Sequence, residues 1–188
     1  MIKFDLDELK LGMILHVRTY AFVGRSIRKV LSCRGKNPVW GNHDAMILRN
    51  NCEWAVGESE PMKAKFTPLS EYESRVNAGK CELKVYDIVE ATNIERQEAA
   101  EYWKATVLGT PYDFMAFPRL FLKNWVMDVF DTDVGWEWAH WCTEGVAHGW
   151  DRGAGKVVWG KKNPTPWTTE KRVGTTLVDV TDKVIKEV

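Results

Sequence analysis

WEWAHWCTEGVAHGW, residues 136 to 150, places one cysteine between a cluster of aromatic residues and the predicted first turn of a helix. Thr143 and Glu144 suit that first turn, and Gly149 is a plausible end of the helix. Exposed backbone N–H groups at a helix start favour negative charge, and the thiolate is the reactive form of a cysteine. Cys142 is therefore a candidate nucleophile, the alternative being a small buried apolar residue.

Length and composition favour one globular domain over residues 1–188. The hydrophobic fraction of 45% and the charged fraction of 28% are those of an ordinary folded protein with a sizeable core. The 26 basic residues are matched by 26 acidic ones along the chain, so the sequence shows no nucleic-acid footprint.

Tryptophan is the outlier, with 10 residues, half of them between Trp125 and Trp150. This density suits an aromatic core or a ligand groove. The segment 114–138 is predicted to be an aromatic-rich helical insert. Charged residues interrupt Phe114 to Phe130, so this stretch cannot span a bilayer, although peripheral membrane contact stays open.

The four cysteines include no CxxC pair, so a structural zinc site is not expected, and neither is any other metal or cofactor. The N-terminus mixes charged with apolar residues and does not resemble a signal peptide. Free thiols and no export signal favour a reducing, cytoplasmic location. The oligomeric state stays open.

Hydrophobic periodicity predicts an α+β fold with a mostly antiparallel sheet packed against helices. The expected strands are Leu9–Thr19 (after a turn), His43–Leu48, Cys52–Glu58, Glu82–Val89, Val157–Gly160 and Thr175–Val180. The expected helices are Ala21–Cys33, Leu69–Asn77, Asn93–Leu108, Phe114–Phe130 and one opening at Cys142. Pro61–Pro68 is expected to be irregular or an edge, and Pro164–Glu170 a turn.

A thiol nucleophile needs a base within hydrogen-bonding reach. Of the four histidines, His43 is the best candidate, because it opens a strand directly after a loop and can lean toward a helix end. His16 lies in an apolar strand and is expected to be structural. His140 is too close to Cys142 in sequence to face it, and His148 is too far along the helix.

The base in turn needs an orienting group. Glu58 and Glu60, at the end of the neighbouring strand, are both placed to accept a hydrogen bond from the imidazole. The alternative is that both carboxylates are simply solvated.

Taken in order, the motifs LKLGMIL, GNHDAMIL, WAVGESEP, TPLSEY, VLGTPYDF and HWCTEG resemble those of the permuted papain-like cysteine hydrolases. These are the YiiX-type branch of the NlpC-type amidase superfamily, related to lecithin–retinol acyltransferase. The resemblance covers roughly residues 12–167 and implies a small barrel-like antiparallel sheet in a circularly permuted papain-like domain. Met13 and Thr143 depart from the family pattern, as does Trp141, which leaves the oxyanion pocket in doubt.

Carried over by motif, the resemblance implies Cys142 as nucleophile, His43 as base and Glu58 as orienting acid. Tyr112, with Asp113, falls on the family's G-x-P-Y-D turn, and Thr165 and Pro166 on its Thr-Pro signature. The candidate substrate-binding residues are Tyr112, Trp141 and Trp40.

The implied reaction is acyl transfer through a thioester, with an amide or ester substrate such as a cell-wall peptide or an acylated lipid. Two alternatives remain open. The first is a non-catalytic module that binds a ligand in the tryptophan-rich groove. The second is a structural protein that uses the same cluster as an interface.

Overall fold

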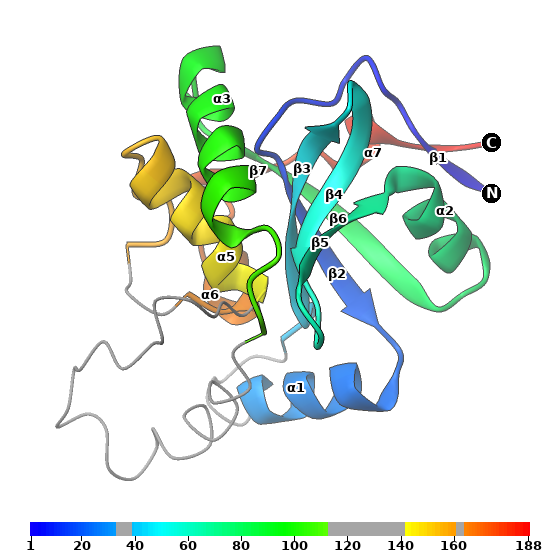
Figure 1. The fold of residues 1–188 in the computed structure, drawn as a ribbon. Helices are drawn as coiled ribbons and strands as arrows, with labels where there is room; N and C mark the ends of the chain where they lie inside the picture. The colour runs from blue at the N-terminus through cyan, green and yellow to red at the C-terminus, as the bar shows by residue number, and fades with distance from the viewer. Residues whose placement is uncertain (33–38, 113–141, 161–163) are drawn as a thin grey trace, which may run out of the picture.

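The computed structural model describes residues 1–32, 39–112, 142–160 and 164–188. Six antiparallel strands form one sheet in the order β5-β4-β3-β2-β6-β7, with helices on both faces (Figure 1). The strands are β2 (Ile14–Thr19), β3 (His43–Asn50), β4 (Glu53–Ser59), β5 (Ala64–Pro68), β6 (Cys81–Ile88) and β7 (Leu177–Asp179). The α+β prediction is confirmed. The sheet is open rather than barrel-like, because β5 and β7 do not pair with each other within the described residues.

Helices cover the two faces unequally. Those on one face include α3 (Asn93–Tyr102) and α5 (Cys142–His148), which continue as the π-helical turns η1 (Trp103–Val107) and η2 (Gly149–Gly153). On the opposite face lies α2 (Leu69–Asn77), while α1 (Phe22–Ser32) crosses the lower end of the molecule (Figure 1). Two short helices, α6 (Pro166–Glu170) and α7 (Thr181–Val184), belong to the C-terminal part. Within the described residues, every helix is too short or too polar to cross a bilayer.

The alternation of side chains along the central strands divides the core in two. Ile14, Met46 and Leu48 face the α3 and α5 side, where they join Trp103 and Trp150. The intervening residues point to the other face and pack with Tyr72 of α2; they are Leu15, Val17, Ala45 and Ile47. The central strands are therefore buried on both sides, which fixes their register.

The turn between β3 and β4 has two residues, Asn51 and Cys52, because β3 extends beyond its predicted end at Leu48 and β4 begins at Glu53, after the predicted start at Cys52. Asn51 and Cys52 both have positive φ, 48° and 68°, as a two-residue type I′ turn requires. The hairpin then pairs Asn50 with Glu53 and Met46 with Gly57. This register carries the end of β4 alongside the start of β3.

Gly12 allows the first loop to close against the aromatic core. Its φ is +78°, and a Cβ at this position would lie 2.4 Å from Trp150 Cζ2. The Trp150 indole N–H donates to the Gly12 carbonyl at 3.1 Å. Trp150, one end of the tryptophan-rich stretch, is thus a core residue.

Several predictions of local structure need correction. Val157–Gly160 is not a strand; Trp159 is buried there, with its indole N–H donating to Thr169. The predicted turn at Pro164–Glu170 contains α6, which Thr165 caps by accepting from the backbone N–H of Thr168. The helix expected to end near Gly149 continues through η2.

The chain ends form a second sheet that the sequence analysis missed. Strand β1 (Ile2–Phe4) pairs antiparallel with β8 (Ile185–Glu187), bringing the N- and C-termini together (Figure 1). Both strands have only three residues, too few for alternation to be recognised in the sequence. The predicted helix at Phe114–Phe130 lies outside the described residues.

Candidate active site

Three separate parts of the chain meet at one end of the sheet. His43 is the first residue of β3, Glu58 is next to last in β4, and Cys142 is the first residue of α5. Gly57 of β4 pairs with Met46 of β3, so the next residue, Glu58, lies opposite Ala45. Ala45 is two residues after His43, and both side chains therefore point to the same face of the sheet. A glutamate can reach a diagonal neighbour at this separation.

Glu58 holds His43 by a direct hydrogen bond, with 2.8 Å between Oε2 and Nε2 of the imidazole. The carboxylate is 2% exposed and also accepts from the hydroxyls of Tyr72, at 2.5 Å, and Thr67. Burial alone would raise the pKa of Glu58, but the bonds from His43, Thr67 and Tyr72 outweigh it and lower the pKa to about 2. Glu58 is therefore ionised at neutral pH.

The other side of the imidazole meets Cys142. Burial would lower the pKa of His43, but hydrogen bonds to the side chains of Cys142 and Glu58 raise it well above 6.5. Since Glu58 occupies Nε2, Nδ1 is the nitrogen left for the sulfur. An imidazolium held in this way stabilises a thiolate beside it. The His43 side chain is 16% exposed, so the site is open to solvent at the imidazole.

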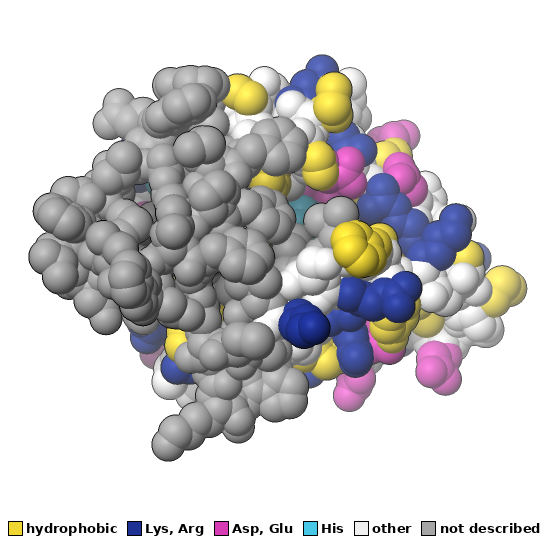
Figure 2. Space-filling view, turned by 90° about the horizontal axis from the view of Figure 1, so that it is seen from below, with side chains coloured by type: hydrophobic (Ala, Val, Ile, Leu, Met, Phe, Trp, Pro, Cys, Tyr) yellow, Lys and Arg dark blue, Asp and Glu magenta, His cyan; other side chains and the backbone are white. Residues whose placement is uncertain are grey.

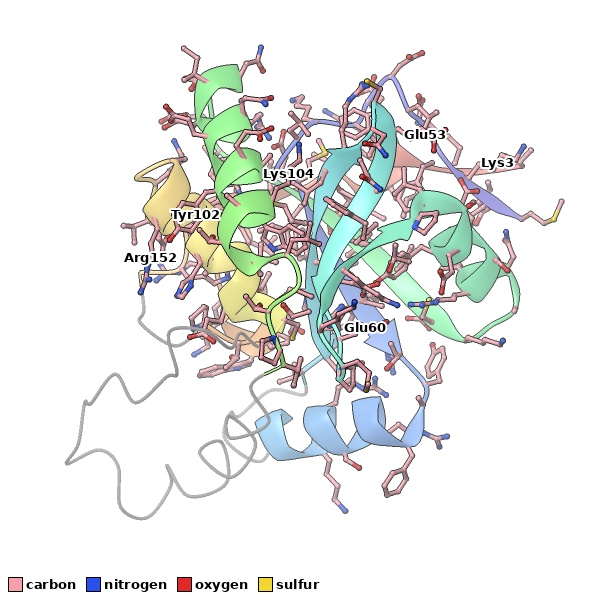
Figure 3. All side chains as sticks on the ribbon, in the orientation of Figure 1. Lys3, Glu53, Glu60, Tyr102, Lys104 and Arg152 are labelled. Atoms are coloured by element: carbon pink, nitrogen blue, oxygen red, sulfur yellow. The ribbon has the colours of Figure 1, made fainter. Side chains whose placement is uncertain are left out.

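The structure decides between the two glutamates of the sequence analysis. Glu60, just past the end of β4, pairs with Lys65 at 2.7 Å and lies 3.7 Å from Arg75 (Figure 3). Glu58, not Glu60, is the partner of His43.

Two glycines allow α5 to approach the sheet and η1 closely. A Cβ on Gly145 would lie 3.1 Å from both Ser59 Oγ and Val107 Cγ1, and one on Gly149 would lie 2.7 Å from Met46 Cε. A Cβ at Gly149 would require the Met46 side chain to shift, and one at Gly145 would make an unusually tight contact with Ser59 and Val107. The spacing of Cys142, Gly145 and Gly149 thus serves packing as well as chemistry.

The supporting residues of the site were not assigned roles from sequence. Thr67 and Tyr72, which hold Glu58, are the first and last residues of the TPLSEY motif. Asp44 follows His43, and Thr143 follows Cys142; their side chains share a hydrogen bond of 2.6 Å. Asp44 is a charged residue inside a largely apolar strand, and this was the sequence feature that could have indicated a buried polar contact there.

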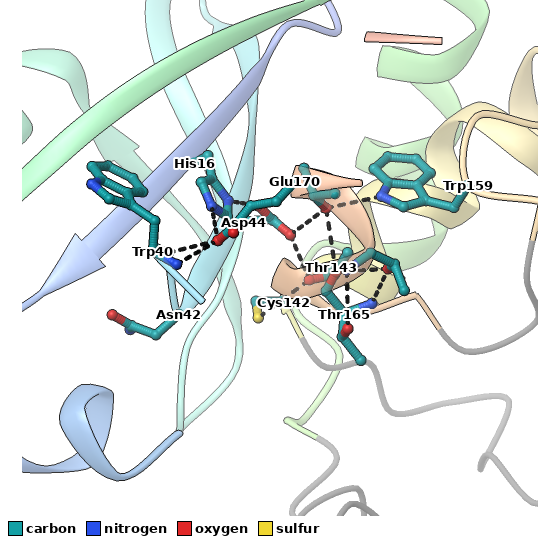
Figure 4. A network of polar contacts seen from close by, with 12 residues as sticks. His16, Trp40, Asn42, Asp44, Cys142, Thr143, Trp159, Thr165 and Glu170 are labelled. Atoms are coloured by element: carbon teal, nitrogen blue, oxygen red, sulfur yellow. Dashed lines mark hydrogen bonds and ion pairs between the residues drawn. The ribbon is translucent and has the colours of Figure 1, made fainter. Parts of the chain in front are cut away.

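The predicted substrate-binding residues have different outcomes. Trp40 stacks on the imidazole of His16, with 5.4 Å between ring centroids, and its ring points away from Cys142 (Figure 4). Lys84 lies over the same ring at 4.9 Å, so Trp40 has a packing role that the sequence analysis did not foresee. Tyr112 is half-buried, and its substrate role stays a prediction. Trp141, like His140 and the predicted insert 114–138, lies outside the described residues.

Among the described residues, no three histidine, cysteine, aspartate or glutamate side chains are grouped in a way that could hold a metal ion. The oxygens of Glu58 already accept from His43, Thr67 and Tyr72.

Comparison with known proteins supports the type of fold but does not assign a function. No family model matches the sequence, and no curated protein does. Among solved structures, the chain is similar to YiiX from Escherichia coli O157:H7, described as a metalloprotein of the family DUF1105. The TM-score is 0.57 at 18% sequence identity, over 91% of this chain and 96% of YiiX. The chain has a YiiX-type fold.

Proposed function

We propose that this protein is a thiol-dependent hydrolase of the amidase or peptidase type, which cleaves an amide or ester through a Cys142–His43–Glu58 triad. The observation that carries the proposal is the position of the His43 imidazole, bonded at 2.8 Å to a buried carboxylate and within hydrogen-bonding reach of a thiol. Nucleophile, base and orienting acid are the parts that acyl transfer requires.

In the proposed reaction, the Cys142 thiolate attacks the substrate carbonyl carbon and forms a tetrahedral intermediate. His43, protonated at Nδ1, gives its proton to the leaving amine or alcohol as the carbonyl re-forms and a thioester remains. His43 then takes a proton from water, which attacks the thioester and releases the acid and the thiolate. Glu58 keeps the imidazole oriented and stabilises its charged form throughout.

The oxyanion of each tetrahedral intermediate needs hydrogen-bond donors. Cys142 is the first residue of α5, so its backbone N–H has no partner one turn earlier within the helix. We assign this N–H as one donor. The same helix start favours the negative charge on the sulfur.

The substrate class is proposed more broadly, as a peptide amide or an acylated lipid. Figure 2 shows Lys and Arg side chains gathered on the face seen from below, beside exposed apolar side chains. Helix α1 lies at this end, with Phe22 82% exposed. Burial and the charges of Arg18 and Arg25 lower the pKa of Arg28.

A lipid substrate predicts that this basic, partly apolar face binds anionic membranes. Co-sedimentation with phosphatidylglycerol vesicles, compared with phosphatidylcholine vesicles, tests this part. No binding to either would leave peptide amides as the proposed substrates.

The thiol itself is tested by alkylation with iodoacetamide at pH 6, with each cysteine quantified by peptide mass spectrometry. Cys52 is exposed and Cys81 is buried, so they are internal controls. We expect Cys142 to react at least ~10-fold faster than Cys52, because its thiolate is paired with an imidazolium. Cys142→Ala should abolish turnover of a panel of amide and ester substrates. Equal reactivity of Cys142 and Cys52 would instead favour a non-catalytic binding module.

A further inference from the structure

A second buried histidine lies directly behind the proposed site. His16 is fully buried, with Nδ1 2.5 Å from Asp44 Oδ1 and Nε2 3.2 Å from Glu170 Oε1 (Figure 4). Burial alone would lower the pKa of His16, but Asp44 and Glu170 raise it to about 9. At neutral pH this is an imidazolium between two carboxylates.

Asp44 connects this network to the nucleophile helix. Its Oδ2 accepts from the hydroxyls of Thr143, at 2.6 Å, and Thr169, at 2.8 Å, while Oδ1 faces His16. All four side chains are fully buried. Of the donors to Asp44, Thr143 alone belongs to α5, and it adjoins Cys142.

The network also holds the chain on the other side of His43. Glu170 Oε1 accepts from the backbone N–H groups of Trp40 and Gly41, both at 2.8 Å. The residues before His43 are thus tied to α6, and the residue after it is tied to α5. His43 itself takes no part in these bonds.

We propose that Asp44 and Thr143 are positioning residues, whose mutual hydrogen bond sets the distance between the Cys142 sulfur and the His43 imidazole. Asp44 follows His43 and Thr143 follows Cys142 in the sequence. A hydrogen bond between Asp44 and Thr143 therefore holds the backbone at His43 and the backbone at Cys142 at a fixed separation. This inference rests on the proposed function for its catalytic consequence. The inferred effect on the distance between the Cys142 sulfur and the His43 imidazole does not depend on the proposed function.

The direction of the bond has a second consequence at the sulfur. The Thr143 hydroxyl has one proton, and it is given to Asp44, which has no proton to share when ionised. Thr143 Oγ1 lies 3.9 Å from Cys142 Sγ, so the oxygen presents lone pairs toward the sulfur. His43 is then the side-chain donor for the thiolate, and Thr143 does not compete with it.

The test compares four variants by the pH dependence of Cys142 alkylation, which reports the ionisation of the thiol beside His43. Thr143→Val and Thr143→Ala remove the hydroxyl, Thr143→Ser restores it, and Thr169→Val removes a different donor to Asp44 away from α5. We expect the two hydroxyl-free variants to lose about tenfold in alkylation rate at pH 6, with the midpoint of the profile moved about one pH unit upward. Thr143→Ser and Thr169→Val should keep the wild-type profile.

Crystal structures of wild type and of Thr143→Val or Thr143→Ala separate this inference from the proposed function. A longer sulfur-to-imidazole distance in the variant supports positioning even if Cys142 proves unreactive. An unchanged distance, or a wild-type alkylation profile in the hydroxyl-free variants, would overturn it. If Thr169→Val shifts the profile as far as Thr143→Val does, the effect belongs to the network as a whole and the specific role of Thr143 is wrong.

Discussion

The described part of the chain contains two histidine–carboxylate pairs, His43 with Glu58 and His16 with Asp44, and only the second is fully buried. His43 has one carboxylate, a thiol and a side chain 16% exposed. His16 has two carboxylates, no exposed side-chain surface and a ring stacked against Trp40. In both pairs the side-chain partners of the imidazole raise its pKa. The proposed function assigns catalysis to the first, because of the two imidazoles only that one adjoins both a thiol and solvent.

The third partner is therefore what distinguishes the two pairs. Around His43 it is the thiol of Cys142 at a helix start, and around His16 it is Glu170, which also accepts from two backbone N–H groups. Carboxylates in both pairs are saturated by hydroxyl donors, which holds them ionised and oriented. The same local chemistry thus places one imidazole where we propose a catalytic base and buries the other among fixed hydrogen-bonding partners.

The largest expected effect sharpens the catalytic side of this comparison. In Glu58→Gln, the orienting carboxylate is replaced by an amide that can no longer stabilise the His43 imidazolium. We expect kcat to fall by on the order of 10² to 10⁴-fold, as loss of an orienting acid does in related triads. Glu60→Gln is the matched control, since that residue pairs with Lys65 instead. Comparable losses in both variants would contradict the assignment of Glu58.

The next effect tests the structural side. His16→Gln removes the cation that neutralises Asp44 and Glu170, and leaves two carboxylates near each other with little or no solvent. We expect it to lower the free energy of unfolding by about 3–5 kcal/mol, the cost of breaking a buried ion pair. His43→Gln should cost less than half as much, because Glu58 keeps Thr67 and Tyr72 as donors. Urea unfolding of both variants at pH 7 measures the difference; equal losses would remove the distinction.

The smallest of the three effects is the pH dependence of stability. The pKa of His16 is raised from 6.5 to about 9, so its contribution is complete below pH 6.5 and is lost as the pH rises to 9. That shift corresponds to roughly 3 kcal/mol. The pKa of Glu58 is lowered to about 2, so its contribution is complete above pH 4.5 and is lost as the pH falls toward 2.

Stability is therefore expected to be greatest between about pH 4.5 and 6.5, as far as these two groups decide it. Urea unfolding at pH 6 and pH 9.5 measures the alkaline limb. In His16→Gln the difference between those two values should shrink, while in Glu60→Gln it should not. A wild-type stability that rises from pH 6 to 9.5 would show that His16 is not held as an imidazolium.

Sequence reasoning went furthest where patterns are local. The strands at β2, β3, β4 and β6 were recognisable because branched apolar residues alternate or run together and turn residues flank them. The helix at Leu69–Asn77 was predicted to the residue. It went wrong at Val157–Gly160, where apolar residues are buried by packing against α6 rather than by strand pairing.

The candidate site was only partly accessible in the same way. Cys142 and His43 are recognisable by their positions at a helix start and a strand start. His16 was expected to be structural, but its partners Asp44 and Glu170 were not predicted, because these contacts span 28 and 154 positions of the chain. The apolar residues around His16 in its strand indicate that this side chain is buried, but they do not indicate which side chains form hydrogen bonds with it.

The sequence by itself determined the class of fold and the order of the main elements, and it singled out Cys142 and His43 as candidates, because periodicity, turn residues and helix-start preferences are properties of neighbouring residues. The choice of Glu58 over Glu60, the packing role of Trp40 and the buried tie between Asp44 and Thr143 were decided by tertiary structure alone. Each depends on the register of one strand against another and on the seating of α5 and α6 at the sheet. Such distances arise only when the whole core packs.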